Sequence, residues 1–284
     1  MIAFVGSVFS PYYAWSGRKT PQDHVSINVG LYAPGAQRWT MTERGQAALS
    51  RNGVTFTVGP SALRWEQGTL TLDFDEISLP WYTTNLIPRR ITGRVTVRPS
   101  VVTDRVYDID GEGRHRWWPI APDARIEVET DGLRWQGHGY MDCNWGTVGL
   151  EEDFRYWDWS RGTLADGSAV ILYDTHRRDG SHGLIAIRFD GEGRATPFEA
   201  PPSVPVKRGL WGVARSIACD PGHMPVVEKT LEDGPFYNRS IISTHLAGQK
   251  ARMMHESFSG DRFGSRLVKL MLPFRMPRRR RWRD

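Results

Sequence analysis

Hydrophobic and polar side chains alternate with a period of two residues in many parts of this chain. Alternation of this kind is typical of β-strands that bury one face. Asp-Gly pairs, which readily adopt the positive φ angles of tight hairpin turns, lie between or beside the alternating segments. The alternating segments are 69–74, 91–97, 124–130, 169–173 and 184–189, and the Asp-Gly pairs are at 110–111, 131–132, 166–167, 179–180, 190–191 and 233–234. Helical periodicity is scarce, so the pattern predicts an all-β protein, an antiparallel barrel or sandwich.

The regularity of the strand pattern differs between the two halves of the chain. The second half is a regular succession of strands and turns, whereas the first half has proline-rich connections around Pro80 and Pro88. A chain of 284 residues is long enough to bury one large core or two smaller ones. We therefore expect two β domains, residues 1–150 and 151–284, with a boundary near residue 150.

The two ends of the chain need separate interpretation. The apolar segment 1–9 lacks the basic start of a signal peptide, and we expect it to form the first strand. Residues 262–272 fit a short amphipathic helix that Pro273 would end. Such a helix either lies on a membrane surface or packs on the β domains. Its apolar face would carry Phe263, Leu267, Leu270 and Met271, with Arg266 and Lys269 elsewhere.

The net charge is concentrated at the C-terminus. The formal charge is +5, and the segment 275–284, with six arginines and one aspartate, accounts for all of it. A nucleic-acid-binding domain spreads its basic residues along a groove, so we expect no nucleic-acid partner. The arginine-rich segment either binds an anionic membrane surface or is a solvated terminus. No segment has the length of a membrane span, and the two cysteines give no disulfide framework.

Candidate chemistry gathers on the strand predicted over 133–142. Alternation places His138, Tyr140 and Asp142 on one face of this strand, with Tyr140 and Asp142 about 7 Å apart. His115 and Trp117 share a face by the same rule. Together these residues offer an acid, an imidazole and aromatic rings, a set that suits a reaction through a carbocation.

Other kinds of site find little support in the sequence. No G-x-S-x-G nucleophile elbow and no phosphate-binding glycine loop is present. His176 and His182 flank a polar turn without an evident further ligand, so we expect no metal and no cofactor. Asp158, between two tryptophans, is expected to be a buried structural carboxylate.

Several blocks of the sequence are similar to one known family. The chain resembles the acyclic carotenoid 1,2-hydratases, also called hydroxyneurosporene synthases, over nearly its whole length. The matching blocks are Phe4–Trp15, Met41–Gly45, Gly59–Trp65, His115–Pro119, Gly137–Asp142, Trp157–Ser160, Met254–Ser257 and Leu272–Met276.

The resemblance implies a fold, a reaction and a set of site residues. The fold would be two lipocalin-like β domains with a cavity at or near their interface. The reaction would add water across the terminal 1,2 double bond of neurosporene or lycopene without a cofactor. The resemblance makes Asp142 the proton donor and matches His115, Trp117 and Tyr140 to the family's other functional positions. Trp118, Trp145 and His138 are expected to line the substrate site.

The chemistry explains why such residues are needed. An alkene is a poor base, so the pKa of Asp142 must rise from about 4 to about 7, which desolvation in an apolar site can supply. The rings of Trp117 and Tyr140 would each stabilise the resulting tertiary cation by about 2 kcal/mol. His115 would orient the attacking water or donate a hydrogen bond to Asp142, with His138 as the alternative for this role.

Two other functions fit the same residues. A lipocalin-like carrier of carotenoids or other polyisoprenoids would keep the aromatic site but would not need a desolvated acid. A related polyene cyclase would use the same acid to start ring closure. For the hydratase we expect a peripheral location on the cytoplasmic side of the membrane, because an acyclic carotenoid is almost insoluble in water.

Overall fold

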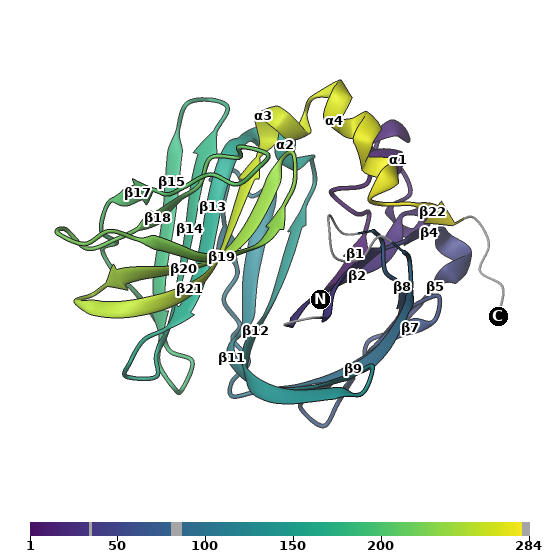
Figure 1. Ribbon diagram of the computed structural model, residues 1–284, viewed down its shortest axis with the longest axis horizontal. Helices are drawn as coiled ribbons and strands as arrows, with labels where there is room; N and C mark the ends of the chain where they lie inside the picture. The colour runs from purple at the N-terminus through teal and green to yellow at the C-terminus, as the bar shows by residue number, and fades with distance from the viewer. Residues whose placement is uncertain (34–35, 81–86, 280–284) are drawn as a thin grey trace. The chain divides into compact units, whose positions relative to one another are not determined.

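The computed structural model describes residues 1–33, 36–80 and 87–279. Antiparallel strands dominate these residues, which confirms the prediction of an all-β protein (Figure 1). Each of the five segments with alternating side chains lies within a strand, and segment 1–9 contains the short strand β1 (Ile2–Val5). Among the described residues, no helix has the length and hydrophobicity needed to cross a bilayer.

The chain divides into two compact units. The first takes in residues 1–99, 124–139 and the segment from 269 onward, and the second takes in residues 100–123 and 140–268. Two long strands, β11 (His115–Thr130) and β12 (Leu133–Gly146), belong partly to each unit. The φ angles of 45° at Asp131 and 78° at Gly132 form the predicted hairpin turn between them. A domain boundary near residue 150 stays a prediction.

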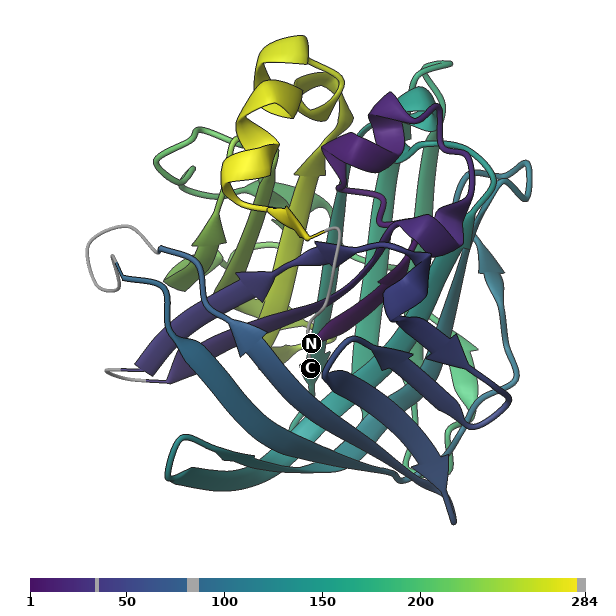
Figure 2. The same ribbon diagram turned by 90° about the vertical axis from the view of Figure 1, so that its right-hand side faces the viewer.

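Two sheets make up the first unit. One has the strand order β1-β2-β4-β22, with β3 also paired to β2, and the other runs from β11 through β9, β8, β7 and β6 to β5. Strands β8 and β9 are long and curved (Figures 1 and 2). The bounds are β2 (Val25–Ala33), β3 (Ala36–Met41), β4 (Glu43–Arg44), β5 (Leu49–Arg51), β6 (Thr55–Val58), β7 (Ser61–Glu66), β8 (Thr69–Ile77), β9 (Arg90–Pro99) and β22 (Arg278–Arg279), with helical turns α1 (Pro11–Trp15), η1 (Pro21–Asp23), η2 (Gln46–Ala48) and η3 (Leu272–Phe274).

The core of the first unit follows from alternation. Val25, Ile27 and Val29, spaced two apart on β2, are fully buried and pack with Phe74 of β8 and Ile91 of β9. Burying such aliphatic and aromatic side chains stabilises the fold by about 1.5–3 kcal/mol each.

A seven-stranded antiparallel sheet forms the centre of the second unit. Its strand order is β16-β15-β14-β13-β21-β20-β19, and a separate hairpin pairs β17 with β18. The bounds are β10 (Tyr107–Asp108), β13 (Phe154–Thr163), β14 (Ala169–Arg177), β15 (His182–Phe189), β16 (Ala195–Pro197), β17 (Ser203–Pro205), β18 (Ser216–Ala218), β19 (Val226–Asp233), β20 (Tyr237–Leu246) and β21 (Gln249–Ser259), with helices α2 (Leu150–Asp153) and α3 (Gly260–Phe263).

The register of this sheet separates its side chains into two faces. Directly paired residues of antiparallel strands point to the same side of the sheet. Trp159 pairs with Tyr173 on β14 and with Glu256 on β21, so these three share one face. Asp158 pairs with Asp174 and therefore lies on the opposite face. An aliphatic core cluster that includes Leu172 and Met253 lies on the Asp158 side.

The prediction of one continuous amphipathic helix over 262–272 is wrong, because the structure has two short helices there. The segment contains α3, a break at Gly264 and Ser265, and then α4 (Arg266–Met271). Phe263 is buried, whereas Leu267 and Leu270 are exposed, so the four apolar residues do not share one buried face.

Candidate active site

Three of the predicted site residues, Trp117, Tyr140 and Asp142, form a hydrogen-bonded group in the second unit. Trp117 Nε1 donates to Tyr140 Oη at 3.0 Å and to Asp142 Oδ2 at 3.1 Å. Tyr140 and Asp142 are two residues apart on β12, so both point to the same side, as predicted. Asn144, two residues further on, donates from Nδ2 to the same Asp142 oxygen at 3.2 Å.

The pKa of Asp142 is raised to about 6. The largest cause is burial, which disfavours the charged carboxylate, and the negative charge of Glu256 acts in the same direction. Hydrogen bonds from Trp117, Asn144 and Tyr140 lower the pKa but do not cancel the rise. The direction is the predicted one, and the value leaves about one tenth of the carboxyl groups protonated at pH 7.

Asp142 combines an exposed residue surface with a desolvated carboxyl group. The residue as a whole is exposed, yet protein surrounds its carboxyl group closely enough to disfavour the charge. The two are compatible, because the pKa depends on the surroundings of the carboxyl group and not on the accessible surface of the whole residue. Water can therefore reach the residue while the carboxyl group remains in a largely protein environment.

Aromatic rings from the seven-stranded sheet lie against this group. The ring centroids of Tyr140 and Trp159 are 5.4 Å apart, and those of Trp117 and Tyr173 are 5.7 Å apart. Burial and the nearby charge of Asp142 raise the pKa of Tyr173 well above its usual value. Trp159, Tyr173 and Glu256 thus present an aromatic face with one carboxylate toward Asp142.

Trp117 occupies a position different from the one predicted for a cation-stabilising ring. Its side chain has no exposed surface, and its ring lies 5.3 Å from that of Tyr107 and 5.7 Å from that of Tyr173. A ring without accessible surface cannot touch a substrate in this arrangement. Its N–H group donates to Tyr140 and Asp142, an arrangement that suits a positioning residue, and its part in the reaction stays a prediction.

His115 is bonded to Asp153 and not to Asp142. Its Nε2 lies 2.9 Å from Asp153 Oδ2, and the side chains of both residues are buried. Burial lowers the pKa of His115, although the charge of Asp153 acts in the opposite direction. The predicted hydrogen bond from His115 to Asp142 is therefore corrected, and its predicted contact with the attacking water stays a prediction. Asp153 was not foreseen, because it lies on α2, 38 residues further along the chain.

The three residues expected to line the substrate site lie elsewhere on the same strands. Trp118 is next to Trp117, so alternation directs it to the other side of β11, where its Nε1 donates to the Thr103 carbonyl at 2.8 Å. Trp145 is exposed and alternates with Asn144 on β12. His138 is exposed and lies in the part of β12 that belongs to the first unit. Their contact with substrate stays a prediction.

Four neighbours of the predicted site residues were not predicted from the sequence: Asn144, Asp153, Tyr173 and Glu256. Two of them had a usable signal, since Asn144 follows the matching block Gly137–Asp142 by two residues and Glu256 stands in the matching block Met254–Ser257. Tyr173 and Asp153 are ordinary strand and helix residues in the sequence. Only the tertiary fold shows that they contact Trp117 and His115.

The expectation that His176 and His182 lack a further ligand is wrong. These two side chains and Asp174 offer ligand atoms that all lie within 4.8 Å of one another. Asp158 fits its structural role: it is buried and accepts hydrogen bonds from Ser216 at 2.8 Å and from Ser257 at 2.5 Å.

The arrangement around Asp142 is suited to proton donation. It contains a carboxyl group with a raised pKa, held by three donors and bordered by aromatic rings. Such an acid can protonate a weakly basic carbon in a site where the rings stabilise the positive charge that forms.

Comparison with known proteins shows one family over the whole chain. The family model described as "Carotenoid hydratase CrtC" matches residues 1–284. The chain is 46% identical to the acyclic carotenoid 1,2-hydratase of Thiocapsa roseopersicina, covering 98% of this chain and 68% of the relative. It is 44% identical to the protein of that name from Cereibacter sphaeroides, covering 99% of each. With the one from Rhodobacter capsulatus it shares 40% identity over 100% of this chain and 99% of the relative.

Proposed function

The chain belongs to the carotenoid hydratase CrtC family, and on this basis we propose that it adds water across the terminal 1,2 double bond of an acyclic carotenoid. The relatives described above are named for this reaction. The observation in the structure that carries the proposal is the raised pKa of Asp142 beside an aromatic face. The reaction makes the protein a hydro-lyase.

The proposed reaction begins with proton transfer from Asp142 to C2 of the terminal double bond. The π electrons of that bond form the new C–H bond, and a tertiary cation remains at C1. Water then attacks C1, and the proton that it loses returns to the Asp142 carboxylate. Water is consumed, a tertiary alcohol forms, and the enzyme is restored without an external acid or base.

The surroundings of Asp142 support each step. Trp117 and Asn144 both donate to Oδ2, so we assign the transferred proton to Oδ1. The rings of Tyr140 and Trp159, 5.4 Å apart, supply π electrons for the cation. The residue is reachable from solvent although its carboxyl group is desolvated. The end of the hydrocarbon chain and one water would approach Asp142 from this solvent-reachable side.

The alternative functions make different demands on Asp142. A carotenoid carrier has no use for a carboxyl group with a raised pKa, whose burial costs free energy. A cyclase would use the same acid, and would differ only in capturing the cation with a second double bond of the substrate. The names of the relatives favour water as the nucleophile.

One incubation separates the three functions. Purified protein is mixed with lycopene in detergent under argon, and the products are identified by mass. A product heavier by one water supports hydration, an isomer of unchanged mass supports cyclisation, and unchanged lycopene supports carriage. Replacing Asp142 by Asn should lower the rate by about 10²–10⁴, whereas Glu192→Gln, at an exposed loop carboxylate, should leave it unchanged. Near wild-type turnover by D142N would remove Asp142 from the mechanism.

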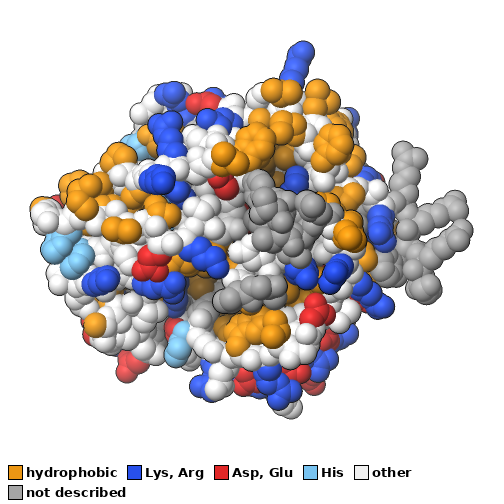
Figure 3. Space-filling view, viewed as in Figure 1, with side chains coloured by type: hydrophobic (Ala, Val, Ile, Leu, Met, Phe, Trp, Pro, Cys, Tyr) orange, Lys and Arg blue, Asp and Glu red, His pale blue; other side chains and the backbone are white. Residues whose placement is uncertain are grey.

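We also propose that the protein binds the cytoplasmic face of the membrane, where its substrate dissolves. The helix α4 supports this proposal, because Leu267 and Leu270, with Phe274 just beyond, are exposed large apolar residues. Figure 3 shows hydrophobic side chains gathered where Figure 1 draws α4. Arg266 and Lys269 on the same helix add the positive charge that favours an anionic surface.

A further inference from the structure

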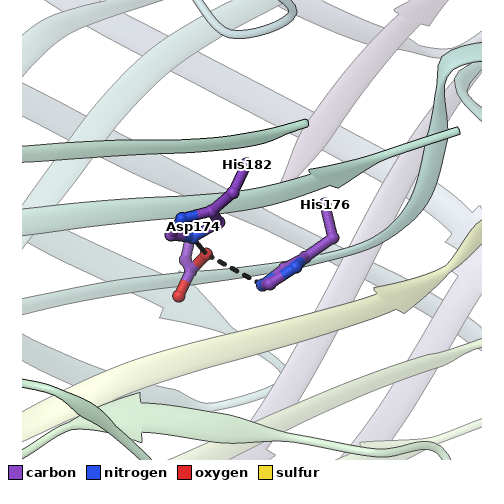
Figure 4. A group of neighbouring side chains, drawn as sticks. All are labelled: Asp174, His176 and His182. Atoms are coloured by element: carbon purple, nitrogen blue, oxygen red, sulfur yellow. Dashed lines mark hydrogen bonds and ion pairs between the residues drawn. The ribbon is translucent and has the colours of Figure 1, made fainter. Parts of the chain in front are cut away.

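Three potential metal ligands meet on one hairpin of the second unit. Asp174 and His176 are two residues apart on β14 and therefore share a face. His182 is the residue of β15 paired directly with His176. The turn between these strands thus fixes the position of His182 relative to the other two. Figure 4 shows both imidazoles directed toward the Asp174 carboxylate.

The two distances from the carboxylate to the imidazoles are close to those around a small divalent ion, and all three ligand atoms lie within 4.8 Å of one another. Asp174 Oδ1 is 3.3 Å from His176 Nε2 and 2.6 Å from His182 Nε2. Ligands bound tetrahedrally to zinc at 2.0–2.1 Å lie about 3.4 Å from one another. The first distance already has this value, and the second would lengthen by less than 1 Å. The ion would replace the protons that now lie between the carboxylate and the two imidazoles.

Neighbouring side chains hold two of these ligands in place. Ser203 donates from Oγ to Asp174 Oδ2 at 3.0 Å, which leaves Oδ1 directed toward the imidazoles. Tyr156 stacks on His176, with ring centroids 4.1 Å apart and an interplanar angle of 19°. Partners that fix the orientation of metal ligands in this way are typical of protein metal sites.

We propose that Asp174, His176 and His182 form a binding site for a zinc-type divalent metal ion. Three protein ligands leave the fourth tetrahedral position to water, and the half-exposed side chain of His182 gives solvent access to it. The site lies on the opposite face of β14 from Tyr173, so it is separate from the Asp142 group. The bound ion would link β14 to β15.

Direct titration tests the site without carotenoid. The full-length protein is stripped of metal with EDTA, dialysed and titrated with Zn²⁺ in a calorimeter. A second titration uses Co²⁺ and follows the visible absorption of tetrahedrally coordinated Co²⁺. We expect one ion per chain, with Asp174→Asn and His182→Ala each lowering the affinity by at least tenfold. Ser203→Ala should lower it by about tenfold, because loss of an orienting partner commonly costs 10–100-fold in metal affinity.

The control uses a second pair of neighbouring histidines, whose rings are stacked. His223 and His245 have ring centroids 3.7 Å apart, and among the described residues they belong to no group of three metal-ligating side chains. His245→Ala should therefore leave the stoichiometry and affinity unchanged. Circular dichroism establishes that each variant is folded before it is titrated.

Each outcome decides for or against the site. Zinc at hundredfold excess over Kd should raise the Tm of the wild type by about 5 °C and leave that of D174N unmoved. Binding that survives D174N and H182A, or that disappears in H245A, would overturn the assignment, as would the absence of binding by the folded wild type. If the protein hydrates carotenoid without bound zinc, the proposal of this metal site is unaffected, because the proposed reaction uses Asp142.

Discussion

At the scale of single residues, opposing influences determine the acidity of Asp142. Burial and the charge of Glu256 raise its pKa, and hydrogen bonds from Trp117, Asn144 and Tyr140 lower it. The same donors that stabilise the carboxylate also fix its position. The resulting pKa of about 6 reflects two opposing requirements: the carboxyl group must be protonated, and hydrogen bonds must hold it in place.

The first prediction at this scale concerns pH. Asp142 donates only in its protonated form, and the fraction of that form falls as pH rises through its pKa of about 6. We expect kcat/KM for hydration to be constant at low pH, to bend near pH 6 and to fall about tenfold per pH unit above it. Rates at subsaturating lycopene between pH 5 and 8 measure this profile. A rate that increases across this range would contradict the role of Asp142 as the acid.

A second prediction uses the two neighbours with opposite effects. Trp117→Phe removes a donor that lowers the pKa of Asp142, so the bend in the profile should move to higher pH. Glu256→Gln removes a negative charge that raises this pKa, so the bend should move to lower pH. Each shift is expected to be on the order of one pH unit.

The matched control for Glu256 is Glu232. Both carboxylates bind Arg239, at 2.8 Å and 2.7 Å, but Glu232 is not among the main influences on Asp142. Glu232→Gln should therefore leave the pH profile in place. Equal shifts in E232Q and E256Q would mean that Arg239, and not the charge of Glu256, sets the acidity of Asp142.

At the scale of elements, two of the blocks that resemble the hydratase family build a buried ion pair in the first unit. Arg44 of β4 donates to both carboxylate oxygens of Glu76 on β8, at 3.1 and 2.8 Å. Ser61 of β7 donates to Glu76 at 2.8 Å. At Gly59, where φ is +59°, a Cβ atom would lie 2.8 Å from Arg44 Nε. Arg44, Gly59 and Ser61 of the Met41–Gly45 and Gly59–Trp65 blocks thus have a structural role around Glu76.

The stability prediction follows from this ion pair. Glu76→Gln leaves the buried Arg44 charge without its counter-ion, and it should lower the free energy of unfolding by about 3–5 kcal/mol. Urea denaturation followed by fluorescence measures the loss. Asp73→Asn removes the partner of Arg64 and Arg94 on the exposed side of the same sheet, where about 1 kcal/mol or less is expected. Equal losses for the two variants would contradict the importance of burial.

The elements also show how far the sequence alone can lead. Alternation and Asp-Gly turns identify strands because both are local properties, and they place Tyr140 and Asp142 on one face correctly. Contacts between distant segments are different. Neither the bond from His115 to Asp153 nor the proximity of Glu256 to Asp142 leaves a periodic signal. The turn beside His176 and His182 was visible in the sequence, but the register that pairs them directly was not.

At the scale of the whole molecule, the arginine-rich C-terminal segment is not simply a solvated tail, because its described residues contact other parts of the chain. Arg275 donates to the Pro80 carbonyl at 2.6 Å and lies 4.4 Å from the ring of Trp39. Arg278 pairs with Asp23 at 2.8 Å and also with Glu43. Met276 between them is buried. Residues 280–284 lie outside the described part of the chain. Removing residues 275–284 would therefore disturb the fold as well as the charge.

Membrane binding needs a test that separates apolar from electrostatic attraction. Flotation with anionic vesicles should show at least tenfold weaker binding for the triple variant L267S/L270S/F274S, because each exposed side chain would lose apolar burial in the bilayer. Leu210→Ser with Met224→Ser, at exposed positions elsewhere, is the matched control.

A chain ending at Arg279 keeps Met276 and the partners of Arg278 but loses three arginines. If these arginines contribute about 1 kcal/mol each near an anionic surface, binding at low salt should weaken by about a hundredfold and become less sensitive to salt. Unchanged flotation of the shortened chain would restrict membrane attraction to α4. Unchanged flotation of the triple variant as well would remove the proposed membrane contact, and substrate would then have to reach Asp142 by another route.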